Sequence, residues 1–376
     1  MPPLFSPAMS DFDVIVVGGG PAGATAAAVC AQRGLRVALF EHARFPRHKV
    51  CGDVINPNCW PVLERLGVAE KVHGLPHHEI DGALFATMEL PAVTIPLPRA
   101  TVAIRRSLFD AALLEHARVC GAHVFEEATV HDVSADRRAV TSNGQHVAGK
   151  AIIGADGRHS VTARKAGLAR RRHGGNGHVA LQSHFHAPEA LDRTVQLHLF
   201  RGGYCGLVRI DADLANLCIV TDASGARLHN DCEALFAHTV WRNPRFRELG
   251  VTAEPTEPLQ SAHPLQAPTN VPARNGVFLA GDALRVMEPF TGQGIFFALR
   301  TGELAAEAIC LGSACEQTYA ATVANLYRQC GRTNEWLRRA MYRERAARVL
   351  VPIVRRAPGL AHWLADNVLG DERQFR

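Results

Sequence analysis

The feature that most constrains this chain is a glycine run between an apolar strand and an alanine-rich helix. Residues 13–23 read Asp-Val-Ile-Val-Val-Gly-Gly-Gly-Pro-Ala-Gly, and the helix that follows ends near Gly34. Gly18 permits a tight turn, Gly20 lets the backbone approach a pyrophosphate closely, and Gly23 lets the helix pack against the strand. The phosphates then bind the exposed amides at the positive end of the helix dipole. The run therefore predicts a dinucleotide-binding βαβ unit rather than an ordinary glycine-rich turn.

The second strand of this unit supports the same interpretation. Residues 35–40 are mostly apolar and are followed directly by Glu41. An acidic side chain at this position can accept hydrogen bonds from both hydroxyls of an adenosine ribose. It also argues against a 2′-phosphate on the tightly bound nucleotide.

Composition narrows the class of protein. The 376 residues permit two or three domains, and the net charge of +5 comes from scattered basic residues. The densest basic cluster, residues 169–173, has no interleaved aromatic residues, so we expect a solvated loop and no nucleic-acid partner. The ten cysteines show no C-x-x-C or zinc-type spacing, which predicts reduced thiols, no metal and a cytoplasmic location. Residues 1–10 do not resemble a signal peptide, and no apolar stretch is long enough to span a bilayer.

Two further strands end in acidic motifs. Residues 151–160 form an apolar strand that leads into Asp156 and Gly157 and then into a helix capped by Ser160. Residues 276–283 form another strand, which ends at Asp282. Such an aspartate can accept a hydrogen bond from a ribityl hydroxyl, although Gly-Asp-Ala after a strand is also a common turn.

A long helix begins just after the second of these motifs. Its start carries Gly292, Gln293 and Gly294, whose amides can face a pyrophosphate or a flavin carbonyl.

Together these segments resemble the flavoproteins of the aromatic hydroxylase superfamily, the group A flavoprotein monooxygenases. In that superfamily a glycine fingerprint, a "DG" motif and a "GD" motif converge on FAD. The finer likeness is to the geranylgeranyl reductase-like branch and, more distantly, to flavin-dependent halogenases. It is carried by residues 45–52, Asn56-Pro57, residues 202–207 and residues 289–295. The Trp-x-Trp-x-x-Pro segment of many flavin halogenases is absent.

The resemblance implies tightly bound FAD and a set of contacts to it. Arg105 ends a strand before a helix that Ser107 and Asp110 open in a capping-box arrangement, and its guanidinium can pair with the pyrophosphate. The alternatives are that Arg106 does so, or that both are surface charges. Asp156 is expected at the FAD and NAD(P)H sites, or to tie down its own turn, or both. The full set of expected FAD contacts is Gly18, Gly20, Ala22, Gly23, Glu41, Arg105, Asp156, Asp282, Gly292, Gln293 and Gly294.

The expected fold class is α/β, with a Rossmann-like FAD-binding domain interleaved with a mixed β-sheet substrate domain and a helical C-terminus. We assign residues 11–75, 100–175 and 268–310 to the FAD-binding domain. Residues 76–99 and 176–267 alternate apolar and polar side chains, which is typical of strands in a mixed or antiparallel sheet, and form the substrate domain. Residues 316–376 form the helical C-terminal segment, whose basic residues allow peripheral membrane contact but fit a solvated face better.

The chain holds one nucleotide fingerprint, so we expect NAD(P)H to dock transiently and to reduce the flavin. Two fates of reduced FAD compete. One is monooxygenation, a hydroxylation or epoxidation through a flavin C4a-hydroperoxide; the other is reduction of an alkene or isoprenoid, as in a geranylgeranyl reductase-like ene-reductase. Gln293 favours the first, because reductases of the branch often have Glu there, and Cys51 favours the second. We therefore expect a monooxygenase acting on a hydrophobic or aromatic small molecule, with ene-reduction as the alternative.

Three residues are candidates for the chemistry. Cys51 is a pocket wall or a proton source, or else a small buried apolar residue. Lys49, together with Arg47 and His48, orients substrate or flavin, or lies in an exposed basic loop. Tyr204 lines the pocket or donates a proton, or serves only in packing. His184 and His186 share a strand face without a third ligand, so we expect no metal. A catalytically inert lipid carrier of the same fold is the alternative from another class, but the FAD motifs are intact.

Overall fold

The computed structural model describes most of the chain. It covers residues 11–87, 92–135, 139–170, 178–200, 202–222, 232–251, 254–263, 265, 269–287, 289–312, 315–341 and 359. The basic cluster at residues 169–173 lies partly outside these ranges. The part of the predicted helical C-terminus beyond Met341 lies outside them too, apart from Gly359.

Sheet A is the sheet that carries the glycine motif. Its eight strands run in the order β15-β16-β9-β1-β2-β6, with β8 paired to β9 and β7 paired to β8. Strands β16, β9, β1, β2 and β6 are mutually parallel. The bounds are β1 Asp11–Val17, β2 Val37–Phe40, β6 His123–Phe125, β7 Val130–Ser134, β8 Ala139–Ser142, β9 Gln145–Gly154, β15 Ala273–Arg274 and β16 Val277–Leu279.

The register of sheet A brings the three sequence motifs together. Val17 at the end of β1 pairs with Gly154 at the end of β9, and Gly154 also pairs with Leu279 at the end of β16. Because the carboxyl ends of parallel strands meet at one edge, the turns that follow these three strands lie side by side. That edge is where an open α/β sheet binds its ligand.

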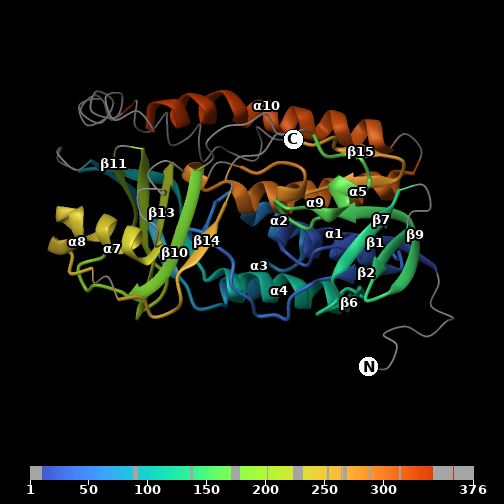
Figure 1. Cartoon of the computed structure of the whole chain (residues 1–376), viewed down its shortest axis with the longest axis horizontal. Helices are drawn as coiled ribbons and strands as arrows, with labels where there is room; N and C mark the ends of the chain where they lie inside the picture. Colours follow the sequence, from blue (N-terminus) through green and yellow to red (C-terminus); the bar gives the residue numbers. More distant parts are fainter. Residues whose placement is uncertain are drawn as a thin grey trace.

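A layer of helices packs against sheet A (Figure 1). Helix α1 packs against α4 and α9, and α10 packs on α9. The bounds are α1 Pro21–Gln32, α2 Cys59–Leu66, α3 Ala69–His73, α4 Arg106–Val119, α5 Val161–Lys165, α9 Gly294–Leu311 and α10 Cys315–Met341, with short 3-10 turns at η1 Gly281–Ala283 and η2 Pro289–Thr291.

Helix α1 lies unusually close to its neighbours because of its small residues. Gly20 is its N-cap and Pro21 its first residue, a combination that suits a helix start. A Cβ atom on Gly23 would lie 1.8 Å from the carbonyl oxygen of Gly18. One on Gly302 of α9 would lie 2.2 Å from the oxygen of Ala22. The glycines therefore let α1 approach both the strand turn and α9.

Sheet B, in contrast to sheet A, is mainly antiparallel. Its eight strands run in the order β14-β10-β13-β12-β11-β4-β5-β3, and all neighbours are antiparallel except β4 and β11. The bounds are β3 Val54–Ile55, β4 His78–Thr87, β5 Val93–Ala103, β10 His178–His186, β11 Thr194–Phe200, β12 Gly203–Arg209, β13 Leu214–Asp222 and β14 Gln260–Ala262. Helices α7 (Cys232–Arg242) and α8 (Pro244–Glu248) cover its outer face, where Phe185 stacks on Phe236 with ring centroids 5.5 Å apart.

The predicted fold class is confirmed: a parallel nucleotide-type sheet, a mixed second sheet and a helical C-terminal part. The exact domain boundaries stay a prediction. Within the residues that the structure describes, no helix is both long and apolar enough to cross a membrane.

Candidate functional site

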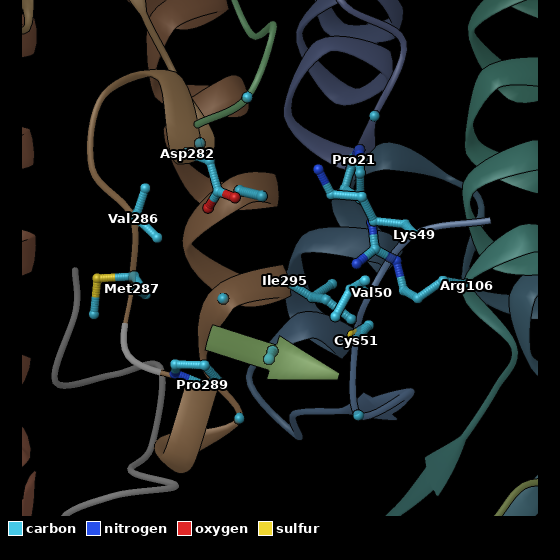
Figure 2. A pocket seen from close by; sticks show the side chains of 18 of the residues that line it. Pro21, Lys49, Val50, Cys51, Arg106, Asp282, Val286, Met287, Pro289 and Ile295 are labelled. Atoms are coloured by element: carbon cyan, nitrogen blue, oxygen red, sulfur yellow. The ribbon is translucent and has the colours of Figure 1, made fainter. Parts of the chain in front are cut away.

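A cavity of about 650 Å³ lies between the two sheets. Figure 2 shows part of its wall, with Asp282 and Met287 on one side and Lys49, Cys51 and Arg106 on the other. The volume lies in the range of ~300–1,000 Å³ that is typical of ligand pockets. The walls come from the turns at the carboxyl edge of sheet A, the segment 47–57, and strands β4, β5 and β11–β13 of sheet B.

Eleven of the fourteen predicted site residues line this cavity. They are Gly18, Gly20, Ala22, Glu41, Lys49, Cys51, Asp156, Tyr204, Asp282, Gly292 and Gly294. Gly23, Arg105 and Gln293 do not line it. Gly23 instead packs against Gly18, and Gln293 is the buried N-cap of α9.

The start of α1 forms an open cradle at one end of the cavity. A Cβ atom on Gly20 would meet only the Nη2 atom of Arg47, 3.4 Å away. The buried Glu41 carboxylate accepts a hydrogen bond from the backbone N–H of Gly19 at 2.6 Å and from that of Ala43 at 2.9 Å. These bonds fix the acid at the end of β2, beside the glycine turn.

Asp156 ties down the turn after β9. Its carboxylate accepts hydrogen bonds from the Ser160 hydroxyl at 2.5 Å and from the Thr162 backbone N–H at 2.9 Å. Ser160 in turn caps α5 by accepting a bond from the Ala163 backbone N–H, which confirms the predicted cap. The turn is therefore rigid where it borders the cavity.

Three charged side chains, Arg158, Asp282 and Lys49, lie near this turn. The Asp282 carboxylate lies 3.9 Å from Nη2 of Arg158, which follows the Asp156-Gly157 pair. Burial lowers the pKa of the Lys49 ammonium, and the nearby Asp282 carboxylate opposes that shift. Lys49 is therefore not the side chain of an exposed basic loop.

Two arginines of the cavity wall each carry a buried nitrogen atom that has no hydrogen-bond partner among the described residues. The Nε atom of Arg47 and the Nη1 atom of Arg158 are buried and make no hydrogen bond to any described residue. Both side chains line the cavity. Buried donors of this kind normally have a partner, so the site fits a ligand that carries anionic groups, as a dinucleotide pyrophosphate does.

The two arginines at the start of α4 have separate roles. Arg105 pairs with Glu257 and points away from the cavity. Arg106 lines the cavity and binds Asp110 through Nε and Nη2, both at 2.8 Å. The predicted capping box is wrong, because α4 begins at Arg106 without a side-chain cap and the Asp110 carboxylate binds that guanidinium instead.

Cys51 and Tyr204, the latter on β12 of sheet B, also line the cavity. Burial raises the pKa of the Cys51 thiol, and the neighbouring Arg106 opposes the shift. Tyr204 is buried, and its ring meets that of Phe290 edge to face with centroids 5.4 Å apart. Apolar side chains complete this part of the cavity: Phe85, Val93, Ile95, Leu97, Val195, Leu197 and Leu265.

Sequence reasoning did not predict Arg158 as an FAD contact, and it named Arg47 only as a candidate for orienting substrate or flavin. Each lies within a few residues of a motif that the sequence shows, Arg47 in the 45–52 segment and Arg158 directly after Asp156-Gly157. Nothing in the local pattern indicates that their guanidinium groups turn inward. Proximity to a motif was the only available signal.

The fold and this cavity define an FAD-dependent enzyme. The FAD binding domain family matches residues 11–202, and the chain belongs to that family. It is thus an oxidoreductase of the group A flavoprotein superfamily, and the prediction of FAD as cofactor is confirmed.

Several characterised proteins are similar in sequence to this chain over most of its length. It is 29% identical over 323 residues to a menaquinone reductase of Mycolicibacterium smegmatis, covering 82% of this chain and 78% of the relative. It is 26% identical over 321 residues to a 1H-pyrrole-2-carbonyl-[peptidyl-carrier protein] brominase of Pseudoalteromonas luteoviolacea, covering 80% and 78%. Among solved structures, the myxobacterial chondrochloren halogenase superposes with a TM-score of 0.79 at 24% identity, covering 97% of this chain and 95% of that one. This last likeness shows the fold alone.

Proposed function

We propose that the protein is an NAD(P)H-driven ene-reductase of the geranylgeranyl reductase-like branch, acting on an apolar alkene of the isoprenoid class. The observation that carries this proposal is the position of Cys51, a half-buried thiol on the wall of the cavity that is protonated at neutral pH. Reduction of a carbon–carbon double bond needs one hydride and one proton. Bound FAD supplies the hydride that it has received from NAD(P)H.

We assign separate roles in cofactor binding, substrate binding and proton donation to the residues of the cavity. Gly20, Glu41 and Arg47 hold the dinucleotide, and Lys49 with Asp282 orients the flavin ring. The apolar wall of sheet B excludes water and takes the hydrocarbon part of the substrate. Cys51 donates the proton to the carbon atom that does not receive the hydride. The menaquinone reductase relatives support this assignment, since the activity that names them is also a reduction.

Monooxygenation is the second candidate. The motif of residues 289–295, with its Gln293, favours it as in the aromatic hydroxylases. Gln293 does not line the cavity, however, and Cys51 does. We therefore rank reduction above oxygenation.

The location proposed for the protein follows from its thiols. Nine of the ten cysteines have side chains that the structure describes, and these nine are free. Reduced cysteines are typical of the cytoplasm, so we propose a cytoplasmic enzyme.

An anaerobic assay tests the reductase. FAD-loaded protein is mixed with NADPH or NADH and with a short-chain menaquinone, and the products are analysed by mass spectrometry. We expect bleaching of the flavin and a product that has gained two hydrogen atoms. Incorporation of an atom from isotope-labelled O₂ under air, with no anaerobic product, would instead support the monooxygenase.

Two matched variants test the proton donor. Cys51→Ala should leave flavin bleaching by NAD(P)H unchanged and slow product formation by about 10²-fold or more, the usual contribution of a positioned acid. Cys218→Ala removes a buried thiol from the same cavity wall and should leave product formation within about twofold. Equal losses in the two variants would exclude Cys51 as the donor.

A further inference from the structure

A buried polar cluster lies behind the Cys51–Val54 segment. We call it the Asp53 cluster and define it as Asp53, His184, Asn216 and Glu257. None of the four lines the cavity, so the cluster is separate from the side chains of the cavity wall. Its members come from the cavity-wall segment, from β10, from β13 and from the chain before β14.

The Asp53 carboxylate is the centre of the cluster and is 2% exposed. Its Oδ1 atom accepts a hydrogen bond from the Arg106 backbone N–H at 3.1 Å. Its Oδ2 atom lies 2.9 Å from Nε2 of His184 and also accepts a bond from the Asn216 amide. A buried carboxylate requires such partners, and here they come from three separate elements.

The backbone at Asp53 needs to be held in place. Its φ is 58°, in the left-handed region that non-glycine residues seldom adopt. The side-chain bonds of Asp53 oppose relaxation of this conformation. Local strain of this kind persists only where the surroundings over-determine it.

Cys51 is tied to the same cluster by two bonds. The Asn216 amide donates to the Cys51 carbonyl oxygen at 2.9 Å as well as to Asp53. The Asp53 backbone N–H points at the Cys51 Sγ atom, 3.4 Å away. The position of the thiol therefore depends on Asp53 and Asn216.

His184 links this turn to the rest of the protein. Its Nδ1 atom lies 2.9 Å from Oε2 of Glu257, so each ring nitrogen faces a carboxylate. Glu257 is held in turn by Arg105, which explains why that arginine points away from the cavity. His186, two residues along β10, is exposed. His184 and His186, which the sequence predicts on one face of a strand, therefore have different surroundings.

We propose that His184 and Asn216 are positioning residues for Cys51. Through Asp53 they hold the Cys51–Val54 segment so that the half-buried thiol faces the cavity. The inference rests on the proposed function, because it assigns a purpose to the position of Cys51. Loss of either residue frees the turn and makes the thiol more accessible to solvent.

The ionisable groups around Cys51 set the expected pH dependence. They are Arg106 on α4, Asp53 on the same segment, Cys59 on α2 and Cys218 on β13. Burial is the largest cause of the raised pKa of Cys51. A freed, hydrated turn should therefore move the pKa of Cys51 down, toward that of an ordinary thiol.

Alkylation of FAD-loaded protein by iodoacetamide measures the exposure of Cys51 without any substrate. Tryptic cleavage after Lys49 and Arg65 gives a peptide with both Cys51 and Cys59, and fragmentation assigns the site. Exposed Cys232 is the internal standard. We expect His184→Gln and Asn216→Ala each to speed alkylation of Cys51 about tenfold and to move its pH profile to lower pH. The rate at Cys232 should not change.

His198→Gln is the matched control. His198 is also a buried histidine of sheet B, but it lies on the outer face against Phe246, with ring centroids 4.5 Å apart. It should leave the rate and the pH profile at Cys51 unchanged. An equal effect in the control, or unchanged alkylation in both cluster variants, would overturn the positioning role. If His184→Gln fails to fold, Asn216→Ala alone decides.

The reductase assay separates this inference from the proposed function. In both cluster variants kcat for alkene reduction should fall while KM for NAD(P)H stays the same. If wild-type protein reduces no alkene but the alkylation results hold, the proposed function fails and the positioning of Cys51 stands. If alkene reduction is found but the variants behave as wild type in both assays, the positioning role fails.

Discussion

Gly20→Val separates the binding of FAD from the stability of the fold. Gly20 has a φ of −68° and a ψ of −177°, which any residue can adopt. A Cβ atom there would touch only the flexible end of Arg47, at 3.4 Å. The valine side chain would project into the cavity, where the pyrophosphate is expected to approach the backbone.

The size of both effects follows from this geometry. Replacing a glycine N-cap by valine costs about 1 kcal/mol of stability, because valine is a poor cap. Filling the space of the ligand costs about 1–3 kcal/mol, the usual range for overpacking. FAD affinity should thus fall by about 5- to 150-fold, while the free energy of unfolding of the FAD-free protein falls by only about 1 kcal/mol.

Gly23→Ala is the comparison. Its Cβ atom would lie 1.8 Å from the Gly18 carbonyl oxygen, where real Cβ contacts are at least 3.0 Å. Because both atoms belong to backbone packing, the helix must shift by more than about 1 Å, and we expect a loss of stability of about 3 kcal/mol or more.

Two measurements on FAD-stripped protein check this pair. Flavin fluorescence titration gives the affinity, and thermal unfolding gives the stability. Gly20→Val should lose affinity and keep its Tm within a few degrees, whereas Gly23→Ala should lose Tm. Unchanged FAD affinity in Gly20→Val would refute the placement of the pyrophosphate at this helix start.

Three further variants have clear expectations. Glu41→Gln should weaken FAD binding about tenfold in the same titration, because both carboxylate oxygens already accept backbone N–H groups and an amide can supply only one acceptor. Asp282→Ala should lower FAD retention on gel filtration; it also removes the carboxylate that opposes the lowered pKa of Lys49, so amine-reactive labelling of FAD-stripped protein at Lys49 should begin at a lower pH than in wild type. Arg65→Ala should cost about 1 kcal/mol by calorimetry, since it removes an exposed two-bond partner from the buried Glu303, which keeps Arg300 at 2.6 Å; a loss above about 3 kcal/mol would contradict that account.

Local patterns in the sequence were sufficient for the fold class and the cofactor. The glycine turn, Glu41 and the acidic residues after two later strands each depend on neighbours within about ten positions, a distance over which strand, turn and helix preferences are readable. The alternation of apolar and polar residues likewise indicated the mixed second sheet. The capping box failed for the opposite reason, because Asp110 found a stronger partner in the buried guanidinium of Arg106.

Sequence alone thus determined that this chain builds a dinucleotide site from three strand ends and covers it with a second sheet. Tertiary structure decided which side chains face that site. The inward turn of Arg47 and Arg158, the outward turn of Arg105 and the Asp53 cluster depend on contacts between distant residues: His184 meets Asp53 across 131 positions and Asn216 meets it across 163. Such contacts form because buried polar groups must find partners wherever the packed elements place them, and no local pattern records that outcome.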